Sequence, residues 1–132
     1  RNPFSTRPYQ HVLESLYAYL MIAAEQYIDS TVSGWYNVGP DDVDCFQTSA
    51  LVELFVNKWG GDIKWIFRYD GGPHEANFLK LDCSKLKSTF GWKPHWNLDM
   101  AVEKVVEWSK CWMSNGDVRA CMDEQIECFL RG

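Results

Sequence analysis

Arg7 is the residue of this chain whose type and position best suit the binding of a charged ligand. It lies in residues 1–12 (RNPFSTRPYQHV), just before the expected start of a long helix. A guanidinium group makes planar, two-pronged hydrogen bonds to phosphate oxygens and keeps its charge at any working pH. The positive end of a helix also favours an anion. Arg7 is therefore predicted to bind phosphate; the alternative is a surface arginine paired with Glu14 or another acid.

A second candidate site is the segment at residues 70–77 (DGGPHEAN), whose glycines and proline predict a loop. His74 can donate a hydrogen bond as a neutral or a cationic ring. Glu75, which follows it, is the third candidate for substrate binding. The alternative is that Gly-Gly-Pro only rigidifies the loop, with His74 and Glu75 solvated.

Several motifs of redox and metal enzymes are absent from the sequence. There is no glycine-rich dinucleotide cradle, and no tyrosine is followed four residues later by a lysine. His11 has a titration range suited to proton transfer, but it has no identifiable acid–base partner, so a structural role is favoured. The five cysteines contain no Cys-x-x-Cys pair and the three histidines are scattered. We therefore predict no catalytic residue and no metal site, and thiols that are reduced and mostly buried.

The composition indicates a single globular domain over residues 1–132. A chain of 132 residues with 46% hydrophobic side chains can bury a core. The net charge of −5 and the lack of a long basic run argue against nucleic-acid binding. No apolar run approaches the roughly 18 residues of a membrane span, and no signal peptide opens the chain, so a cytoplasmic location is expected.

Periodicity and capping residues predict helices at residues 11–29, 48–59, 82–90 and 97–114, and a last helix that begins at Asp117. The inner face of the fourth helix is expected to carry Leu98, Ala101, Val102, Val105, Trp108 and Trp112. The inward residues of the last helix are expected to be Val118, Met122, Ile126 and Phe129. Short strands are predicted at residues 35–39 and 63–69, with an extended segment at 78–81. This is a helix-rich α/β mixture without a complete doubly wound sheet.

Three ordered motifs resemble the extended short-chain dehydrogenases/reductases that act on nucleotide-linked sugars. They are residues 80–94 (KLDCSKLKSTFGWKP) with the helix that follows, the Arg-Pro-Tyr-Gln-His-Val stretch around Arg7, and the Pro-His-Glu-Ala loop. The last two look most like the CDP-glucose 4,6-dehydratase group. Related enzymes carry an arginine in this loop, whereas here Arg68 lies upstream, so His74 would have to replace that phosphate contact.

The resemblance implies that the chain is the C-terminal, nucleotide-sugar-binding portion of a larger parent. In such enzymes the arginine of this stretch binds the diphosphate. A tightly held NAD oxidises the sugar at C4, water leaves across C5–C6, and the hydride returns at C6. The NAD and a Tyr/Lys pair would lie on a missing N-terminal portion, so no cofactor is expected on this chain alone. The expected partners are a CDP-glucose-like nucleotide sugar, that missing portion, and further copies of the chain as a homo-oligomer.

Two other functions remain open. A stand-alone module derived from such an enzyme would expose the apolar face that once packed on the cofactor domain, chiefly on the helix at residues 11–29. Self-association would cover that face. The other possibility is a UDP- or GDP-sugar epimerase or dehydratase, because a few loop contacts decide which base is bound.

The stretch with the strongest resemblance is itself predicted to be structural. Trp92 is expected to fill the core and Pro94 to fix a turn. Asn37 is expected to hold a turn through backbone hydrogen bonds.

Overall fold

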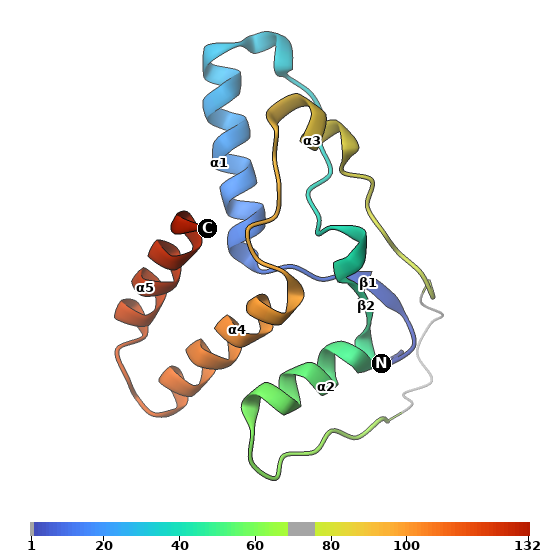
Figure 1. Cartoon of the computed structure of the whole chain (residues 1–132), viewed down its shortest axis with the longest axis vertical. Helices are drawn as coiled ribbons and strands as arrows, with labels where there is room; N and C mark the ends of the chain where they lie inside the picture. Colours follow the sequence, from blue (N-terminus) through green and yellow to red (C-terminus); the bar gives the residue numbers. More distant parts are fainter. Residues whose placement is uncertain (1, 69–75) are drawn as a thin grey trace.

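The structure is a computed structural model that describes residues 2–68 and 76–132. Its elements, in chain order, are β1 (Thr6–Pro8), α1 (Val12–Ile28), the 3-10 turns η1 (Ser30–Val32) and η2 (Asp42–Asp44), β2 (Cys45–Gln47), α2 (Thr48–Trp59), α3 (Ser84–Phe90), α4 (Leu98–Met113) and α5 (Val118–Arg131). In Figure 1, α3 lies beside α1, α5 lies beside α4, and α2 follows the small sheet. The predicted class is confirmed: the described part is helix-rich, with two short strands and no complete Rossmann sheet.

The small sheet pairs the start of the chain with the entry to α2. β1 and β2 are antiparallel, with Arg7 opposite Phe46, and Thr6 also forms a parallel bridge to Phe78. The predicted strand at residues 35–39 is wrong, as is that at 63–69 over its described part, because both segments lack a ladder partner there. An extended segment becomes a strand only when a neighbouring strand accepts its hydrogen bonds.

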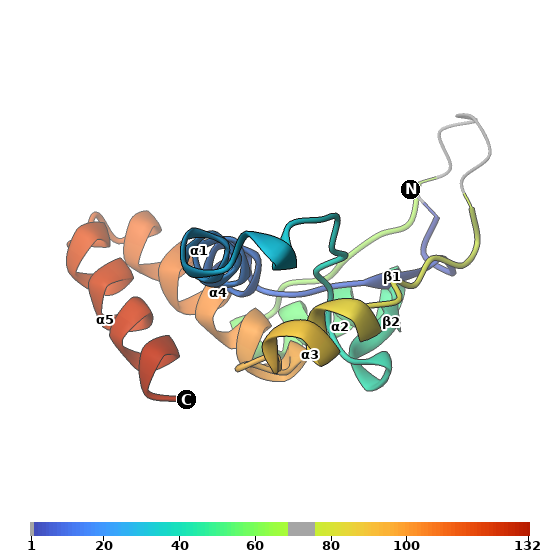
Figure 2. The ribbon, with the colours of Figure 1, turned by 90° about the horizontal axis from the view of Figure 1, so that it is seen from above.

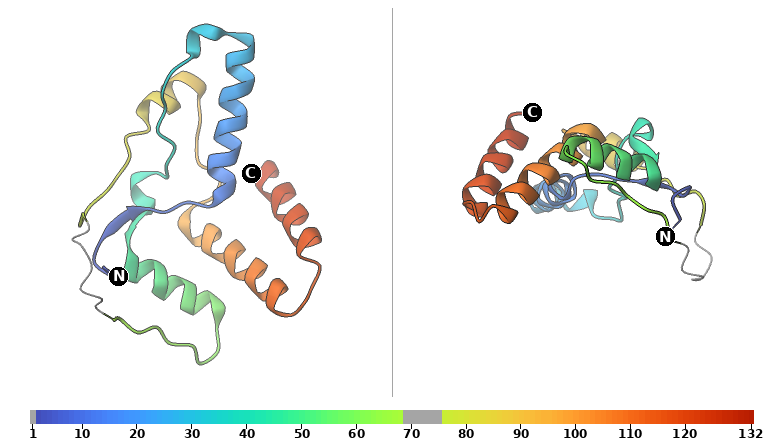
Figure 3. Two further views of the ribbon diagram at one scale, coloured as in Figure 1. Left: turned by 180° about the vertical axis from the view of Figure 1, so that it is seen from behind. Right: turned by 90° about the horizontal axis from the view of Figure 1, so that it is seen from below.

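Two small apolar clusters form the core. Ala18 of α1, Leu86 of α3 and Trp92 make the first, which confirms that Trp92 fills the core. Leu98, Val102 and Val106 of α4 make the second, and α2 packs against it. Figures 2 and 3 show that the elements spread in a shallow layer, so many helical side chains have neighbours on one side only.

Helix α1 buries few of its side chains. Its fully covered residues are Glu14 and Ala18, whereas Leu20 is 71% exposed and Tyr27 is 93% exposed. Leu16 is also exposed. Met21 and Ile22 are half-buried against the first cluster. The helix therefore contacts the rest of the chain along one side and presents several apolar residues of its other side to solvent, as expected from the sequence.

The inner faces predicted for the last two helices are partly wrong. In α4, Val106 is buried instead of Val105, and Trp108 and Trp112 are exposed. In α5, the expected inward residue Phe129 is buried, but Met122 and Ile126 are exposed. The reason is that both helices carry apolar residues over more than one face, so periodicity alone does not select the buried one.

The expectation that the thiols are mostly buried is also wrong, since Cys83 alone among the five is buried. Within the described residues, no helix is long and apolar enough to cross a membrane.

The carboxylate of Glu14 ties α1 to the segment that leads into α4. Glu14 is fully buried, and its Oε1 accepts hydrogen bonds from the backbone N–H groups of His95 (2.9 Å) and Trp96 (2.7 Å). Its Oε2 lies 3.9 Å from His95 Nδ1. Burial raises the pKa of Glu14, and the two N–H groups oppose that rise. The alternative that Glu14 pairs with Arg7 is excluded, because the buried Glu14 carboxylate binds the backbone of His95 and Trp96 instead.

The start of α4 is fixed by two further side chains. Asn97 Oδ1 accepts from the backbone N–H of Met100 at 3.0 Å, and Asp44 Oδ1 accepts from that of Leu98 at 2.9 Å. These bonds satisfy donors that a helix start otherwise leaves without partners. The predicted left-handed Gly91, with φ of 66°, ends α3.

Replacing Glu14 tests this tether. Glu14→Ala leaves two backbone N–H groups buried without acceptors, so the free energy of unfolding should fall by about 3 kcal/mol. In Glu14→Gln the amide oxygen can accept both bonds, so most of that stability should remain. Urea unfolding followed by circular dichroism measures both changes.

The pH dependence gives a second readout of the same substitution. Because burial raises the pKa of Glu14 in the folded state, the parent chain loses stability as the pH rises from the unfolded-state pKa of this carboxyl through the raised folded-state pKa. Glu14→Gln cannot ionise, so its stability relative to the parent chain should increase as the pH rises from 4 to 8. A difference that is constant across this range would contradict the assignment.

Candidate functional site

Arg7 lies in the middle of β1, between two neighbouring extended segments. Its backbone pairs with Phe46 on one side, and the preceding residue Thr6 pairs with Phe78 on the other. Arg7 Nη1 donates to the carbonyl of Thr6 at 2.9 Å, which bends the side chain back over its own strand. Arg7 is half-buried, so part of its surface remains open to solvent.

The segment beside Arg7 is the one that directly follows the second candidate loop. Thr6 N donates to Asn77 O at 2.9 Å, and Leu79 N donates to Thr6 O at 3.1 Å. A side-chain bond from Asn2 Nδ2 to Asn77 Oδ1, at 3.2 Å, strengthens this junction. His74 and Glu75 lie outside the described residues. The structure thus brings together the strand of Arg7 and the end of the loop that carries the other two candidates.

Hydroxyl groups fix the backbone around Arg7 to the start of α2. Tyr9 Oη lies 2.8 Å from Thr48 Oγ1, and Ser5 Oγ lies 3.2 Å from the same atom. Thr48 N donates to Ser5 O at 3.0 Å. The sequence placed Thr48 at the start of a helix, where it or Ser49 was expected to act as the cap. It did not indicate that Thr48 and Ser5 support the strand of Arg7, and α2 has no side-chain cap bond at its start.

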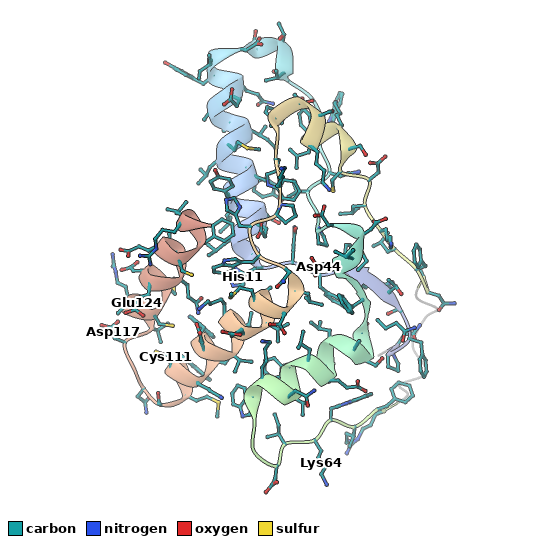
Figure 4. The ribbon with its side chains drawn as sticks, viewed as in Figure 1. His11, Asp44, Lys64, Cys111, Asp117 and Glu124 are labelled. Atoms are coloured by element: carbon teal, nitrogen blue, oxygen red, sulfur yellow. The ribbon has the colours of Figure 1, made fainter. Side chains whose placement is uncertain are left out.

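His11 is held in a structural position at the start of α1. Its Nδ1 accepts a hydrogen bond from Leu13 N at 3.3 Å, which makes it the N-cap of the helix. The ring packs edge-on against Trp96 with centroids 5.0 Å apart. Burial lowers the pKa of His11, which favours the neutral ring that capping requires. In Figure 4, His11 lies near the centre of the chain, where α1 begins.

Two hollows are lined by segments that adjoin the strand of Arg7, although Arg7 itself lines neither, and they differ in chemistry. One, of about 330 Å³, is apolar and lies behind Tyr9 and Gln10, against Leu51 and Phe55 of α2. The other is more polar, has a volume of about 620 Å³, and is lined by Asp41, Asp42, Asp82, Lys80 and Lys87. Its lysines are paired with its acids, Lys80 with Asp42 at 3.5 Å and Lys87 with Asp41. Neither hollow therefore offers a free cluster of cations for a diphosphate.

The motif around residues 80–94 acts as scaffold. Asn37 Nδ2 donates to the carbonyl of Asp82 at 3.1 Å, so the predicted bond to backbone is confirmed, but it joins two distant segments and does not hold a local turn. Lys85 Nζ donates to the carbonyl of Trp35 at 3.2 Å and lies over the ring of Tyr36. Among the described residues, no group of three or more acidic, histidine or cysteine side chains is placed to hold a metal ion.

Comparison with known proteins bears directly on the origin of these motifs. No protein-family model matches the chain. The chain is 39% identical to a CDP-glucose 4,6-dehydratase from Salmonella typhimurium over an alignment of 132 positions, which covers 98% of this chain and 36% of that enzyme. The chain thus spans a little more than a third of the curated relative that it matches. The predicted resemblance is confirmed: the chain is related to a part of a CDP-glucose 4,6-dehydratase.

Proposed function

We propose that this chain is the substrate-side, C-terminal portion of a CDP-glucose 4,6-dehydratase-like enzyme and that it binds the nucleotide sugar. The observation that carries the proposal is the junction of Thr6 with Asn77 and Leu79. It sets Arg7 beside the end of the loop that holds His74 and Glu75. The 39% identity to an enzyme named for CDP-glucose supports the choice of substrate class.

In this proposal Arg7 binds the diphosphate of the nucleotide sugar. Its strand is held on both sides by backbone hydrogen bonds. The backbone that carries the guanidinium is therefore already ordered, so ligand binding loses little further conformational entropy there. The N-terminus of α1, which begins at Val12 five residues further along the chain, adds a positive potential to the same segment. His74 and Glu75 are proposed to contact the same ligand from the loop.

The redox step of the parent reaction belongs, in this proposal, to another portion of the enzyme. The sequence holds no tyrosine followed four residues later by a lysine and no glycine-rich dinucleotide cradle. NAD would supply the hydride acceptor and donor on that portion. This chain would bind and orient the substrate, and alone it would not dehydrate it.

The exposed face of α1 is proposed to pack on that cofactor-binding portion. Together with α4 and α5 it encloses a hollow of about 450 Å³ whose apolar lining includes Leu16, Val105, Trp108, Met122 and Ile126. An apolar surface of this kind on a shallow molecule marks a contact with another polypeptide.

A second candidate function rests on the same face. In a stand-alone homo-oligomeric module, a second copy of the chain would cover α1 in place of a cofactor-binding portion. The net charge of −5 on each copy opposes such pairing weakly, so the contact would have to be apolar.

Titration with CDP, CDP-glucose, UDP and GDP tests substrate binding. We expect chemical-shift changes on residues of β1 and α1 with CDP and CDP-glucose, and weaker ones with the other two nucleotides. Arg7→Ala should weaken binding about 10- to 100-fold, because a charge-assisted contact to the diphosphate is lost. Arg119→Ala, which removes an exposed arginine of α5, is the matched control and should bind as the parent does.

The titration also separates the candidate functions. Preference for UDP or GDP would move the proposal to another sugar-nucleotide enzyme. If no ligand binds at millimolar concentration, even after a cofactor-binding portion has been added, the substrate-side role is wrong.

Sedimentation velocity tests the face on α1. If a second copy covers this face, the parent chain should self-associate in a concentration-dependent way, and Leu16→Lys with Leu20→Lys should return it to a monomer. Val43→Lys, which changes an apolar residue that is 80% exposed on η2, is the control and should leave association unchanged. A parent chain that stays monomeric at high concentration excludes the module. In that case the cofactor-binding portion is the polypeptide that covers the face on α1. Mixing the parent chain with that portion should then give a complex, and the variant with Leu16→Lys and Leu20→Lys should not form it.

A further inference from the structure

Helices α4 and α5 each bring a cysteine to the place where they meet. Cys111 lies near the end of α4 and Cys121 near the start of α5, and both side chains are half-buried. In Figure 4, Cys111 lies on the part of α4 that adjoins α5. Gln125, one turn after Cys121, reaches across to Glu107, one turn before Cys111, with its Nε2 3.4 Å from Glu107 Oε2. Burial raises the pKa of the Cys121 thiol, and the neighbouring Cys111 thiol adds to that rise. The two sulfur atoms therefore face the same small space between the helices.

The turn between the helices holds these two thiols in place. Asn115 adopts a left-handed conformation with φ of 55°, and Gly116 N donates to the carbonyl of Cys111 at 2.9 Å. A Cβ at Gly116 would lie 2.9 Å from Cys111 Sγ, so this glycine is required for the turn to pack on the thiol. On the other side, Gln125 Nε2 donates to Lys104 O at 2.8 Å and lies 3.9 Å from Cys121 Sγ.

We propose that Cys111 and Cys121 form a dithiol site that a small oxidising disulfide, such as oxidised glutathione, converts into an intramolecular disulfide. This dithiol site is independent of the proposed binding role of Arg7. The site is a property of the hairpin that α4 and α5 form.

The reaction is two successive thiol–disulfide exchanges. One thiol of the pair loses its proton, and its thiolate attacks the small disulfide and releases one glutathione thiolate, which leaves a mixed disulfide on the protein. The other cysteine then loses its proton and attacks the protein sulfur of that mixed disulfide, which releases the second glutathione. The protein loses two hydrogen atoms and two electrons, and one oxidised glutathione becomes two reduced glutathione molecules.

The bridge would lock α5 onto α4 at the end of the hairpin next to the turn. At present α5 is held there by Gln125 and, further along, by Phe129, which packs against Tyr17 of α1 with centroids 5.8 Å apart. Covalent closure restricts the unfolded chain and so stabilises the hairpin. Oxidation of this dithiol would make α5 more rigid where it lines the hollow beside α1.

Tryptic mapping of the full chain tests the proposal directly. The chain is equilibrated with mixtures of reduced and oxidised glutathione, free thiols are alkylated, and the protein is digested. Cleavage after Lys110, Arg119 and Arg131 places Cys111 in one peptide (CWMSNGDVR) and Cys121 in the next (ACMDEQIECFLR). We expect a disulfide between these two peptides, reversed by dithiothreitol, together with a rise of about 5 °C in the midpoint of thermal unfolding.

Variants identify the bridged residues. Because the second peptide also contains Cys128, Cys128→Ser is the matched control and should keep both the linked peptides and the thermal shift. Cys111→Ser and Cys121→Ser should each lose both. A link that disappears in Cys128→Ser, a disulfide between two chains, or a glutathione adduct that persists on Cys111 or Cys121 would each overturn the proposal.

Discussion

The buried carboxylate of Glu14 is the interaction on which the arrangement of the helices depends. It lies on α1 and accepts two backbone N–H groups from His95 and Trp96, which precede α4. One side chain thereby positions the first helix relative to the connection between the third and the fourth. A carboxylate without these bonds would not remain in an apolar interior, and the two N–H groups have no other acceptor in the described part of the chain. The edge-on contact of His11 with Trp96 lies in the same junction and depends on the same geometry.

The sequence was sufficient for features that depend on a few adjacent residues. The caps at Asn97 and Asp117, the left-handed Gly91 and the bounds of the long helices follow from local rules of helix formation. The choice of buried face did not follow. Val106 replaces Val105 in the core, because the position of α2 against α4 decides which side of α4 is covered. That position is set by contacts between distant residues, which periodicity does not contain.

The strands were predicted least well, because a strand needs a partner that is often distant in the sequence. Residues 35–39 have the composition of a strand but no partner to pair with, whereas Thr6–Pro8 form one because the entry to α2 lies alongside. The candidate site shows the same division. The chemistry of Arg7 was visible in its residue type, but its place beside the segment after Glu75 required the bridge between Thr6 and Phe78.

The pairing of the first residues with much later ones also has a consequence for the order of folding. Residues 2–6 form hydrogen bonds with Thr48 and with Asn77 to Leu79. Glu14 of α1 can accept its backbone hydrogen bond only after Trp96 has been synthesised. Contacts between such distant positions are slow to form, since the loop between them must close first. On the ribosome, β1 and α1 would leave the exit tunnel well before their partners are synthesised. The apolar face of α1 would then be exposed throughout that delay, when a chaperone is the polypeptide best placed to cover it.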